Sequence, residues 1–211
     1  MSKVSCIVLA AGAGRRMGHD ENKIFIKLGN KSIIQWTLSH IEQVKAVSEV
    51  ILVVADGEAE YMKQHIASLG LSKSIKIITG GKERQDSVYA GLQAVSDDMD
   101  IVLVHDGARP LAKPELFERV IEGAETHGAV TIGVPSTDTI KRVDIDGQVL
   151  ETLNRNELMN IQTPQGFQKD IFKEAQESAK RDAYLGTDDV SLVEYIGKDV
   201  YILDGDYENI K

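Results

Sequence analysis

The chain has 211 residues, and its 33 aspartates and glutamates outnumber its 24 lysines and arginines, which gives a formal net charge of −9 at pH 7. This acidic balance argues against general binding to nucleic acid or to anionic membranes, so an anionic ligand must be met by a local cluster of cations. A single cysteine excludes an intramolecular disulfide, and the five histidines show no ligand spacing with it, which argues against a structural zinc site. We assign no metal-ligating side chain from the sequence.

The length favours one domain, residues 1–211, with an ample core. No apolar stretch approaches the ~18 residues of a membrane span, and the apolar run after Lys3 is too short for the core of a signal peptide. We therefore expect a cytoplasmic protein without a membrane partner.

Short apolar runs bounded by turns predict five buried strands, at 4–9, 49–55, 75–78, 100–104 and 129–134. The segments between them have the amphipathic pattern of helices, near 32–44, 58–69, 84–95 and 114–127. Strands of this kind alternating with helices indicate an α/β fold in three layers, with a mostly parallel sheet covered on both faces. In such folds, ligands bind at the carboxyl ends of the strands.

Residues 139–153 break this alternation, because they read as two short strands around the turn Asp146-Gly147. No crossover helix connects them to the sheet, so we expect a hairpin that projects from it. Such a hairpin, with its flanks at about 136–160, is either a dimerisation arm or a surface flap on a monomer. The pattern leaves both open.

The first strand runs into a glycine-rich turn, Ala10-Ala11-Gly12-Ala13-Gly14-Arg15-Arg16-Met17-Gly18, and Lys23 follows five residues later. Glycines at the end of a strand let backbone N–H groups approach phosphates, and Arg16 and Lys23 would supply positive charge beside them. Met17 stands where a dinucleotide fingerprint needs its third glycine, and no complete P-loop is present in the sequence. The turn therefore points to a nucleoside triphosphate and to chemistry at phosphorus. The alternative is a structural turn with two solvated arginines.

Two further motifs follow predicted strands. Residues 80–88 follow the third strand and open a helix; there Gly81 allows close approach to a base or ribose, and Ser87 can bond a polar edge. The alternative is a plain helix entry with an exposed Arg84. Residues 105–110 follow the fourth strand, where Asp106 could orient Mg²⁺ or a substrate hydroxyl and Arg109 a phosphate. The alternative there is an Asp–Arg pair that braces the turn.

Later in the chain, Thr187-Asp188-Asp189 is expected to cap a helix, and we assign it no chemistry.

Taken together, the motifs appear in one order along nearly all of the chain: A-A-G-x-G-x-R-M, a lysine, G-G-x-x-R-x-x-S-V, H-D-x-A-R-P, D-T-I-K, Q-T-P-Q-x-F and N-I-K. This order resembles the 2-C-methyl-D-erythritol 4-phosphate cytidylyltransferase family. The resemblance implies a Rossmann-like nucleotidyltransferase fold. It also implies transfer of CMP from CTP to 2-C-methyl-D-erythritol 4-phosphate, with release of pyrophosphate, in the non-mevalonate isoprenoid pathway.

The resemblance also implies roles for individual residues. Arg16 and Lys23 would be catalytic, since they would stabilise charge on the α-phosphoryl group and on the leaving pyrophosphate, while Mg²⁺ would be held mainly by CTP phosphates. Cytosine and ribose would be read by the backbone of the glycine turn and by the second motif: Ala11, Gly12, Ala13, Gly14, Gly81 and Ser87. The sugar phosphate would be bound by Asp106, Arg109, Thr139, Arg155, Thr163 and Lys211. Family members exchange the hairpin arm in a homodimer, so Thr139 and Arg155 would reach the partner's site.

The chain departs from the family pattern at three places. Asn22 stands where the family usually has proline before the catalytic lysine, so we expect a less rigid approach of Lys23. Met159 occupies a position often held by tryptophan. The chain stops at Lys211, where relatives continue through roughly another helix, and we expect a terminal lysine to fray.

Two alternative functions stay open at this stage. Ribitol-5-phosphate cytidylyltransferases share the fold and the CTP site, but Ala108 and the pair Lys141-Arg142 favour the erythritol enzyme. A non-catalytic nucleotide-binding domain is the other alternative. It is disfavoured by Arg16, Lys23, Arg155 and Lys211 together, because a binding module needs no cations at the α-phosphate.

Overall fold

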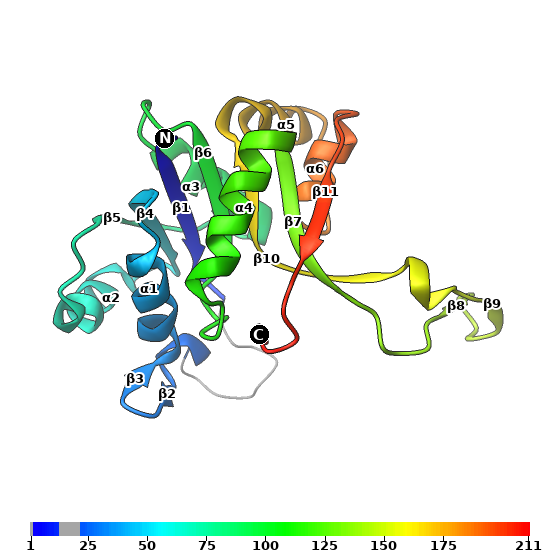
Figure 1. Ribbon diagram of the computed structural model, residues 1–211, viewed down its shortest axis with the longest axis horizontal. Coiled ribbons are helices and arrows are strands. Elements are labelled where there is room, and N and C mark those ends of the chain that lie inside the picture. The colour runs from blue at the N-terminus through cyan, green and yellow to red at the C-terminus, as the bar shows by residue number, and fades with distance from the viewer. Residues whose placement is uncertain (1, 13–21) are drawn as a thin grey trace.

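The computed structural model describes residues 2–12 and 22–211. Its centre is a seven-stranded sheet in the order β11-β7-β10-β6-β1-β4-β5 (Figure 1). The strands are β1 Val4–Leu9, β4 Val47–Val54, β5 Ser74–Thr79, β6 Ile101–Asp106, β7 Ala129–Pro135, β10 Met159–Gln168 and β11 Tyr201–Asp204. The helices are α1 Ile33–Gln43, α2 Ala59–Ile66, α3 Arg84–Ala94, α4 Pro114–His127, α5 Lys169–Arg181 and α6 Val190–Tyr195. Short elements are η1 Lys23–Phe25, β2 Lys27–Leu28, β3 Lys31–Ser32, η2 Ala67–Leu69, β8 Lys141–Val143, β9 Val149–Thr152 and η3 Arg155–Glu157.

The sheet is mostly parallel, as the sequence predicts. The pairs β1–β4, β1–β6, β4–β5 and β7–β11 are parallel, whereas β10 runs antiparallel between β6 and β7. All five predicted strands are present within two residues of their expected bounds. The sequence pattern does not predict β10 or β11, nor the helix α5.

Two apolar layers confirm the predicted three-layer architecture. Along β1, Cys6 and Val8 face a cluster with side chains from α1, α2 and α4, and Ile7 faces the opposite cluster with α3, α5 and α6. This alternation is what a strand covered on both faces requires. The resulting core fixes the positions of the strand ends, where the motifs lie.

The helices begin and end where local chemistry dictates. Ser32 and Gln35 form a reciprocal capping box at the start of α1. In α4, Pro114 occupies the first turn, and the helix ends at Gly128, whose φ of 87° is a conformation that favours glycine. Among the described residues, no helix is both long and apolar enough to cross a membrane.

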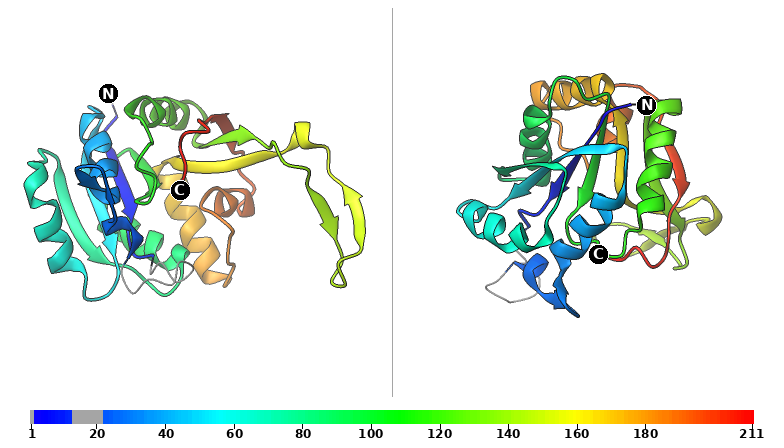
Figure 2. Two further views of the ribbon diagram at one scale, coloured as in Figure 1. Left: turned by 90° about the horizontal axis from the view of Figure 1, so that it is seen from below. Right: turned by 60° about the vertical axis from the view of Figure 1, so that its left-hand side comes forward.

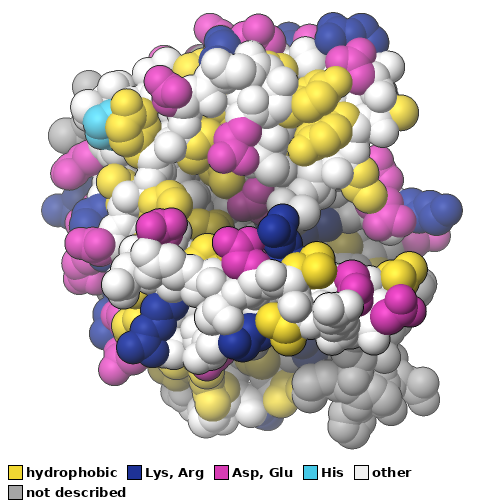
Figure 3. All heavy atoms as spheres, turned by 90° about the vertical axis from the view of Figure 1, so that its right-hand side faces the viewer, with side chains coloured by type: hydrophobic (Ala, Val, Ile, Leu, Met, Phe, Trp, Pro, Cys, Tyr) yellow, Lys and Arg dark blue, Asp and Glu magenta, His cyan; other side chains and the backbone are white. Residues whose placement is uncertain are grey.

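The predicted hairpin is present as β8 and β9, and it projects away from the sheet (Figure 2). At its tip, Asp144 Oδ1 accepts hydrogen bonds from the backbone N–H groups of Asp146 at 3.0 Å and Gln148 at 2.9 Å, and Gly147 has a φ of 85°. These bonds hold the turn that the Asp-Gly pair predicts. The face of the molecule on this side carries apolar side chains interspersed with charged ones (Figure 3).

Candidate active site

The carboxyl ends of four parallel strands coincide. In the register of the sheet, Leu9 of β1 lies beside Val53 of β4 and Asp106 of β6, and Val54 lies beside Thr79 of β5. The loops that leave these ends therefore meet at one edge, as expected for a parallel sheet. The three motifs in the first half of the chain, namely the glycine turn, residues 80–88 and residues 105–110, lie at or directly after these strand ends.

The glycine turn and the second glycine motif are in close contact. Gly80 N donates to Val54 O at 2.8 Å, which continues the sheet by one residue. A Cβ at Gly80 would lie 3.1 Å from Ala11 Cβ and 2.7 Å from Ser87 Oγ, so no larger residue fits between the two loops. The structure thus brings together two segments that the sequence assigns to one nucleotide.

Ser87 shapes the second loop from within. Its buried hydroxyl donates to Glu83 O and accepts from Gly81 N, both at 3.1 Å. A Cβ at Gly81 would overlap the side chain of Asp86. Ser87 thereby fixes the backbone of Gly81 on the loop that faces the glycine turn. The expected bond from its hydroxyl to a polar edge of the ligand stays a prediction.

Lys23 opens η1 directly after Asn22, and its side chain is partly buried. The other proposed catalytic residue, Arg16, lies outside the described residues, as do Ala13 and Gly14 of the predicted nucleotide site. Ala11 and Gly12 are described and follow the end of β1. The site is therefore built here from Ala11, Gly12, Lys23 and the residues beyond them.

Three cations surround the carboxylate of Asp106, which is buried at the end of β6. The Nζ of Lys211 lies 2.9 Å from Oδ2, the Nε of Arg109 lies 3.5 Å from Oδ2, and the Nε of Arg84 lies 3.8 Å from Oδ1. Burial alone would raise the pKa of the Asp106 carboxyl, but Lys211 and Arg84 outweigh it and hold the pKa below its usual value. The Asp106 carboxylate is therefore an anion with three cations beside it. We call Asp106, Arg84, Arg109 and Lys211 the Asp106 cluster.

Arg84 is not the exposed residue of the alternative in which this motif is a plain helix entry. Its Nη2 lies 2.7 Å from Oδ2 of Asp189, whose side chain is only 1% exposed. Burial raises the pKa of Asp189 although Arg84 acts in the opposite direction. The guanidinium thus bridges two carboxylates, Asp189 before α6 and Asp106 at the end of β6.

The adjacent residues Asp188 and Asp189 have different roles, one in capping a helix and the other in an ion pair. Oδ1 of Asp188 accepts from Ser191 N at 3.0 Å and so caps the start of α6, as expected for this segment. Asp189 makes no such capping bond within the described part of the chain and is paired with Arg84 instead. This second role of the segment was not predicted from the sequence. The sequence does hold a signal for it, because two adjacent aspartates stand where one is enough to cap the helix.

Thr163 is fixed against Asp106 through a buried hydrogen-bond chain. Its Oγ1 accepts from Asp106 N at 3.0 Å and lies 3.1 Å from Nδ1 of His105. Burial lowers the pKa of His105 to about 3, so the ring is neutral and Nδ1 can accept the threonine hydrogen. The neutral imidazole therefore orients the Thr163 hydroxyl.

The last residues of the chain are held over the same edge of the sheet. Nδ2 of Asn209 donates to Oε1 of Gln162 at 3.2 Å and to the carbonyl of Thr163 at 3.0 Å, and Nη1 of Arg109 donates to the carbonyl of Asn209 at 2.6 Å. Figure 1 shows the C-terminus on the side of the sheet where the arrowhead of β1 lies. The expectation that Lys211 frays is wrong here, because these bonds and its pairing with Asp106 hold it in place.

Two of the predicted substrate residues lie elsewhere. Thr139 and Arg155 flank the projecting hairpin, and within the described residues neither makes a hydrogen bond or an ion pair with the Asp106 cluster. The structure thus brings Asp106, Arg109, Thr163 and Lys211 together and leaves Thr139 and Arg155 on the arm.

Two observations bear on metal binding. Across residues 2–12 and 22–211, no group of three or more His, Cys, Asp or Glu side chains is arranged to hold a metal ion. Both carboxylate oxygens of Asp106 already face cations. A divalent cation would thus compete with these cations for Asp106, so phosphate oxygens of a ligand fit it better than this carboxylate does.

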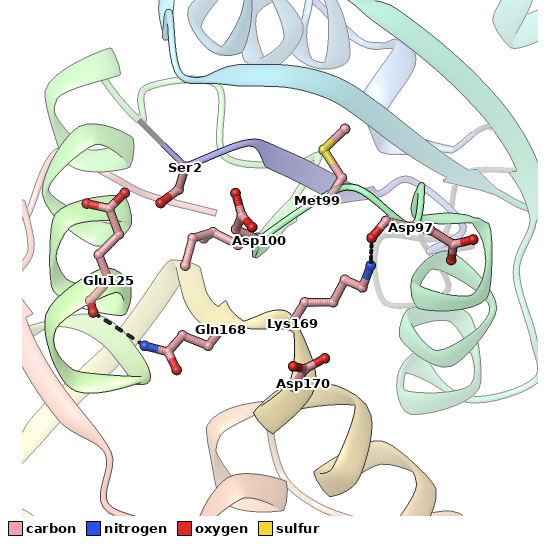
Figure 4. A pocket seen from close by; sticks show the side chains of 9 residues that line it. Ser2, Asp97, Met99, Asp100, Glu125, Gln168, Lys169 and Asp170 are labelled. Carbon is pink, nitrogen blue, oxygen red and sulfur yellow. Dashed lines mark hydrogen bonds between the residues drawn. The ribbon is translucent and has the colours of Figure 1, made fainter.

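An open hollow of about 700 Å³ lies at the opposite end of the sheet (Figure 4). Asp97, Asp100, Glu125 and Asp170 line it, and the Nζ of Lys169 donates to the carbonyl oxygen of Asp97 at 2.6 Å. Carboxylates predominate there, so this hollow is unsuited to a polyphosphate. The Asp106 end of the sheet is the candidate site.

An α/β sheet whose carboxyl ends carry two close-packed glycine loops, a lysine and a cation cluster defines the class of the protein, a nucleotidyltransferase. The IspD family model, described as 2-C-methyl-D-erythritol 4-phosphate cytidylyltransferase, matches residues 4–211. The chain belongs to this family, which confirms the resemblance read from the motifs.

Individual relatives agree. The 2-C-methyl-D-erythritol 4-phosphate cytidylyltransferase of Pelotomaculum thermopropionicum is 45% identical over 100% of this chain and 89% of its own length. That of Alkaliphilus metalliredigens is 47% identical over 100% and 88%. A crystal structure of 4-diphosphocytidyl-2C-methyl-D-erythritol synthase from Anaerococcus prevotii is similar with a TM-score of 0.89 and 33% identity, covering 100% of this chain and 90% of that one.

Proposed function

We propose that this protein transfers CMP from CTP to 2-C-methyl-D-erythritol 4-phosphate and releases pyrophosphate, within the non-mevalonate pathway to isoprenoids. The observation that carries the proposal is the convergence of two glycine loops and the Asp106 cluster at one edge of the sheet. We further propose that residues 1–211 act as one catalytic domain. A cytoplasmic location stays a prediction from the sequence.

The chemistry requires positioning and charge rather than a covalent intermediate. A phosphate oxygen of the sugar phosphate attacks the α-phosphorus of CTP, a new P–O bond forms, and the bond to the β-phosphate oxygen breaks to release pyrophosphate. We propose that Arg16 and Lys23 stabilise the negative charge that develops on the α-phosphoryl group and the leaving group. Ala11, Gly12, Ala13 and Gly14 would line the nucleotide, and Gly81, held by Ser87, would pack against its base.

The sugar phosphate is proposed to bind at the Asp106 cluster. Lys211 and Arg109 carry the positive charge that its phosphate requires, and Thr163 presents a fixed hydroxyl. The carboxylate of Asp106 would accept a hydrogen bond from a substrate hydroxyl in place of one of its contacts with a cation. Each of these side chains is anchored by the contacts described above, which lowers the cost of ordering them on binding.

We propose that the projecting arm completes this site in a homodimer, with Thr139 and Arg155 reaching the partner's cluster. Exposed apolar side chains on the arm support an interface there, namely Val143, Ile145, Val149 and Leu150. Ile145 is fully exposed in the single chain. A protein of this size seldom leaves such a row of residues in water without a partner surface.

Mg²⁺ is proposed as the cofactor, held mainly by the phosphates of CTP. When bound, it would neutralise charge on the triphosphate and so favour departure of pyrophosphate. Both oxygens of the Asp106 carboxylate already face cations at this edge, which fits a metal carried in with the nucleotide.

Pyrophosphate release with CTP and Mg²⁺ tests the function. 2-C-methyl-D-erythritol 4-phosphate and ribitol 5-phosphate are compared in parallel, and we expect release with the first. Release with ribitol 5-phosphate alone would assign the protein to the other cytidylyltransferase class. CTP binding without release in either case would favour a non-catalytic nucleotide-binding domain.

A further inference from the structure

Asn22 is buried beside Lys23, with only 6% of its surface exposed, and its carboxamide joins three segments. Nδ2 donates to the carbonyl of Ala10 at 2.9 Å and to Oε2 of Glu58 at 3.2 Å, while Oδ1 accepts from the backbone N–H of Ile24 at 3.4 Å. Ala10 follows β1 and Glu58 precedes α2. One side chain thus connects the end of the central strand, the helix α2 and the turn that carries Lys23.

These bonds fix the backbone on both sides of Lys23. On one side, Ala10 is itself tied to the sheet, because its N–H donates to Val53 O at 2.7 Å. On the other side, the ring of Phe25 packs edge-on against Tyr61 at 4.8 Å between ring centroids. The peptide of Lys23 therefore lies between an anchored Asn22 and an anchored Phe25.

The backbone of Asn22 already has the conformation that proline enforces. Its φ is −63° and its ψ is 122°, and proline locks φ near −65°. From the sequence, asparagine in place of the family's proline is expected to loosen the approach of Lys23. The structure shows the opposite arrangement, in which hydrogen bonds hold the angle that a ring would hold and add a direct bond to the end of β1.

We infer that Asn22 is a positioning residue for Lys23 in CMP transfer. This inference rests on the function proposed above. Asn22 acts by holding the lysine backbone against the end of β1, so that the ammonium is placed at the reacting phosphates before the substrates bind. Buried hydrogen bonds from an amide to a carbonyl and a carboxylate are suited to this task, because leaving any of these groups unpaired is costly.

A double-mutant cycle with Asn22→Ala and Lys23→Ala tests the inference. Asn22→Ala in the wild-type background is expected to lower kcat for pyrophosphate release by about 10- to 100-fold, since misplacing a catalytic group by an ångström costs that much. In the Lys23→Ala background, the same substitution is expected to change kcat by less than about twofold, because the group that it positions is gone. An equal loss in both backgrounds would overturn the inference.

Two further variants separate positioning from general stability. Ser5→Ala removes a buried hydrogen bond of 2.8 Å to Oε2 of Glu49 at the other end of the sheet, and it should retain wild-type kcat. A loss of kcat in Ser5→Ala as large as that in Asn22→Ala would mark both as stability effects and contradict the inference. Asn22→Pro keeps φ but loses the side-chain bonds, so a smaller loss than in Asn22→Ala is expected.

Asn22→Pro also replaces Asn22→Ala in the cycle if the alanine variant does not fold, with the same expected dependence on Lys23. Failure of the proposed function is a separate result. If the wild-type protein releases no pyrophosphate from CTP, the function is wrong; if it does and the cycle is additive, only the role of Asn22 is wrong.

Discussion

His105 is a buried imidazole that the site uses in its neutral form. It is the next-to-last residue of β6, contacts the ring of Phe117 edge-on at 4.8 Å between centroids, and lies 3.1 Å from the hydroxyl of Thr163. Burial lowers its pKa from 6.5 to about 3. Between these pH values the unfolded chain binds a proton at His105 that the folded chain does not, so the free energy of unfolding must fall as the pH is lowered through this window.

The pH dependence of stability tests this state of His105. Between pH 6 and pH 4, His105→Gln is expected to reduce the slope of the unfolding free energy against pH by about 1.4 kcal/mol per pH unit, the contribution of one proton. Urea titrations of the wild type and the variant at several pH values measure it. An unchanged slope would mean that the imidazole is protonated in the folded protein.

At the scale of single residues, the sequence predicted some of the side chains that meet but not how they are held. Asp106, Arg109, Thr163 and Lys211 were assigned to one substrate through the motif order, and the structure places them together. The pair of Arg84 and Asp189 was not predicted, because a contact between such distant segments depends on the packing of α3 against the loop before α6. The local sequence pattern therefore does not predict this contact.

The C-terminal segment after β11 acts as an element that presents Lys211. Asn209 is its anchor, through bonds to Gln162 and Thr163 and through its carbonyl, which accepts from Arg109. These bonds couple the tail to β10, so the position of Lys211 depends on a residue that need not touch the substrate.

Asn209→Ala is therefore expected to raise KM for 2-C-methyl-D-erythritol 4-phosphate by about tenfold, or ~1.4 kcal/mol, with little change in KM for CTP. Steady-state kinetics with each substrate varied in turn measure both constants. Lys211→Ala should have the same direction, and the two substitutions together should cost less than the product of their separate effects. Equal increases for CTP and for the sugar phosphate would show that the tail supports the whole site rather than one ligand.

The strand β10 shows why an element can escape sequence analysis. Gln162, Thr163 and Gln165 are polar, and Pro164 is rare inside sheets, so the segment lacks the apolar pattern of a strand. All four are buried, because β10 lies between β6 and β7 and its polar groups bond to neighbours such as Thr131, Asp206 and Asp188. Tertiary partners therefore decide this strand.

Gly166 of β10 is the point at which the strand contacts α4. A Cβ there would lie 2.5 Å from Cγ1 of Val120 and 3.0 Å from its carbonyl oxygen. Gly166→Ala is therefore expected to lower the free energy of unfolding by about 1–3 kcal/mol, the range for overpacking a core. Chemical denaturation measures the loss. Adding Val120→Ala should recover part of it by making room, and a double variant as unstable as the sum of the single ones would contradict the packing argument.

At the scale of the whole molecule, the alternation of apolar runs and amphipathic helices sufficed to predict a three-layer α/β fold. It could not place β10 and β11, since their position beyond β6 depends on the antiparallel insertion of β10. The projecting hairpin was predicted from its Asp-Gly turn and is present. Its purpose depends on an assembly of two chains, which no pattern within one chain determines.

If the two chains of a dimer exchange arms, each active site contains residues of both chains, and this leads to a result that a site built from one chain cannot give. If Arg155 serves the partner's active site, Arg155→Ala damages the partner's site, whereas Lys23→Ala damages the site of its own chain. In a mixed dimer of the two variants, the intact arm of the Lys23→Ala chain then meets the intact Lys23 of the other chain, and one complete site is restored. Random exchange makes half of the dimers mixed with one good site each, so about a quarter of wild-type activity should return.

Arg155→Ala is expected to raise KM for 2-C-methyl-D-erythritol 4-phosphate only. Each variant alone is therefore assayed at a concentration of this substrate so low that Arg155→Ala has almost no activity. The two variants are then mixed in equal amounts, and analytical ultracentrifugation with differently labelled chains follows their exchange. Recovery that rises with exchange requires Arg155 to act across the interface. Activity that stays at the sum of the separate variants after complete exchange would place Arg155 at the site of its own chain. A monomer at the concentrations of the assay would remove the dimer from the mechanism altogether, because the arm would then have no second site to complete.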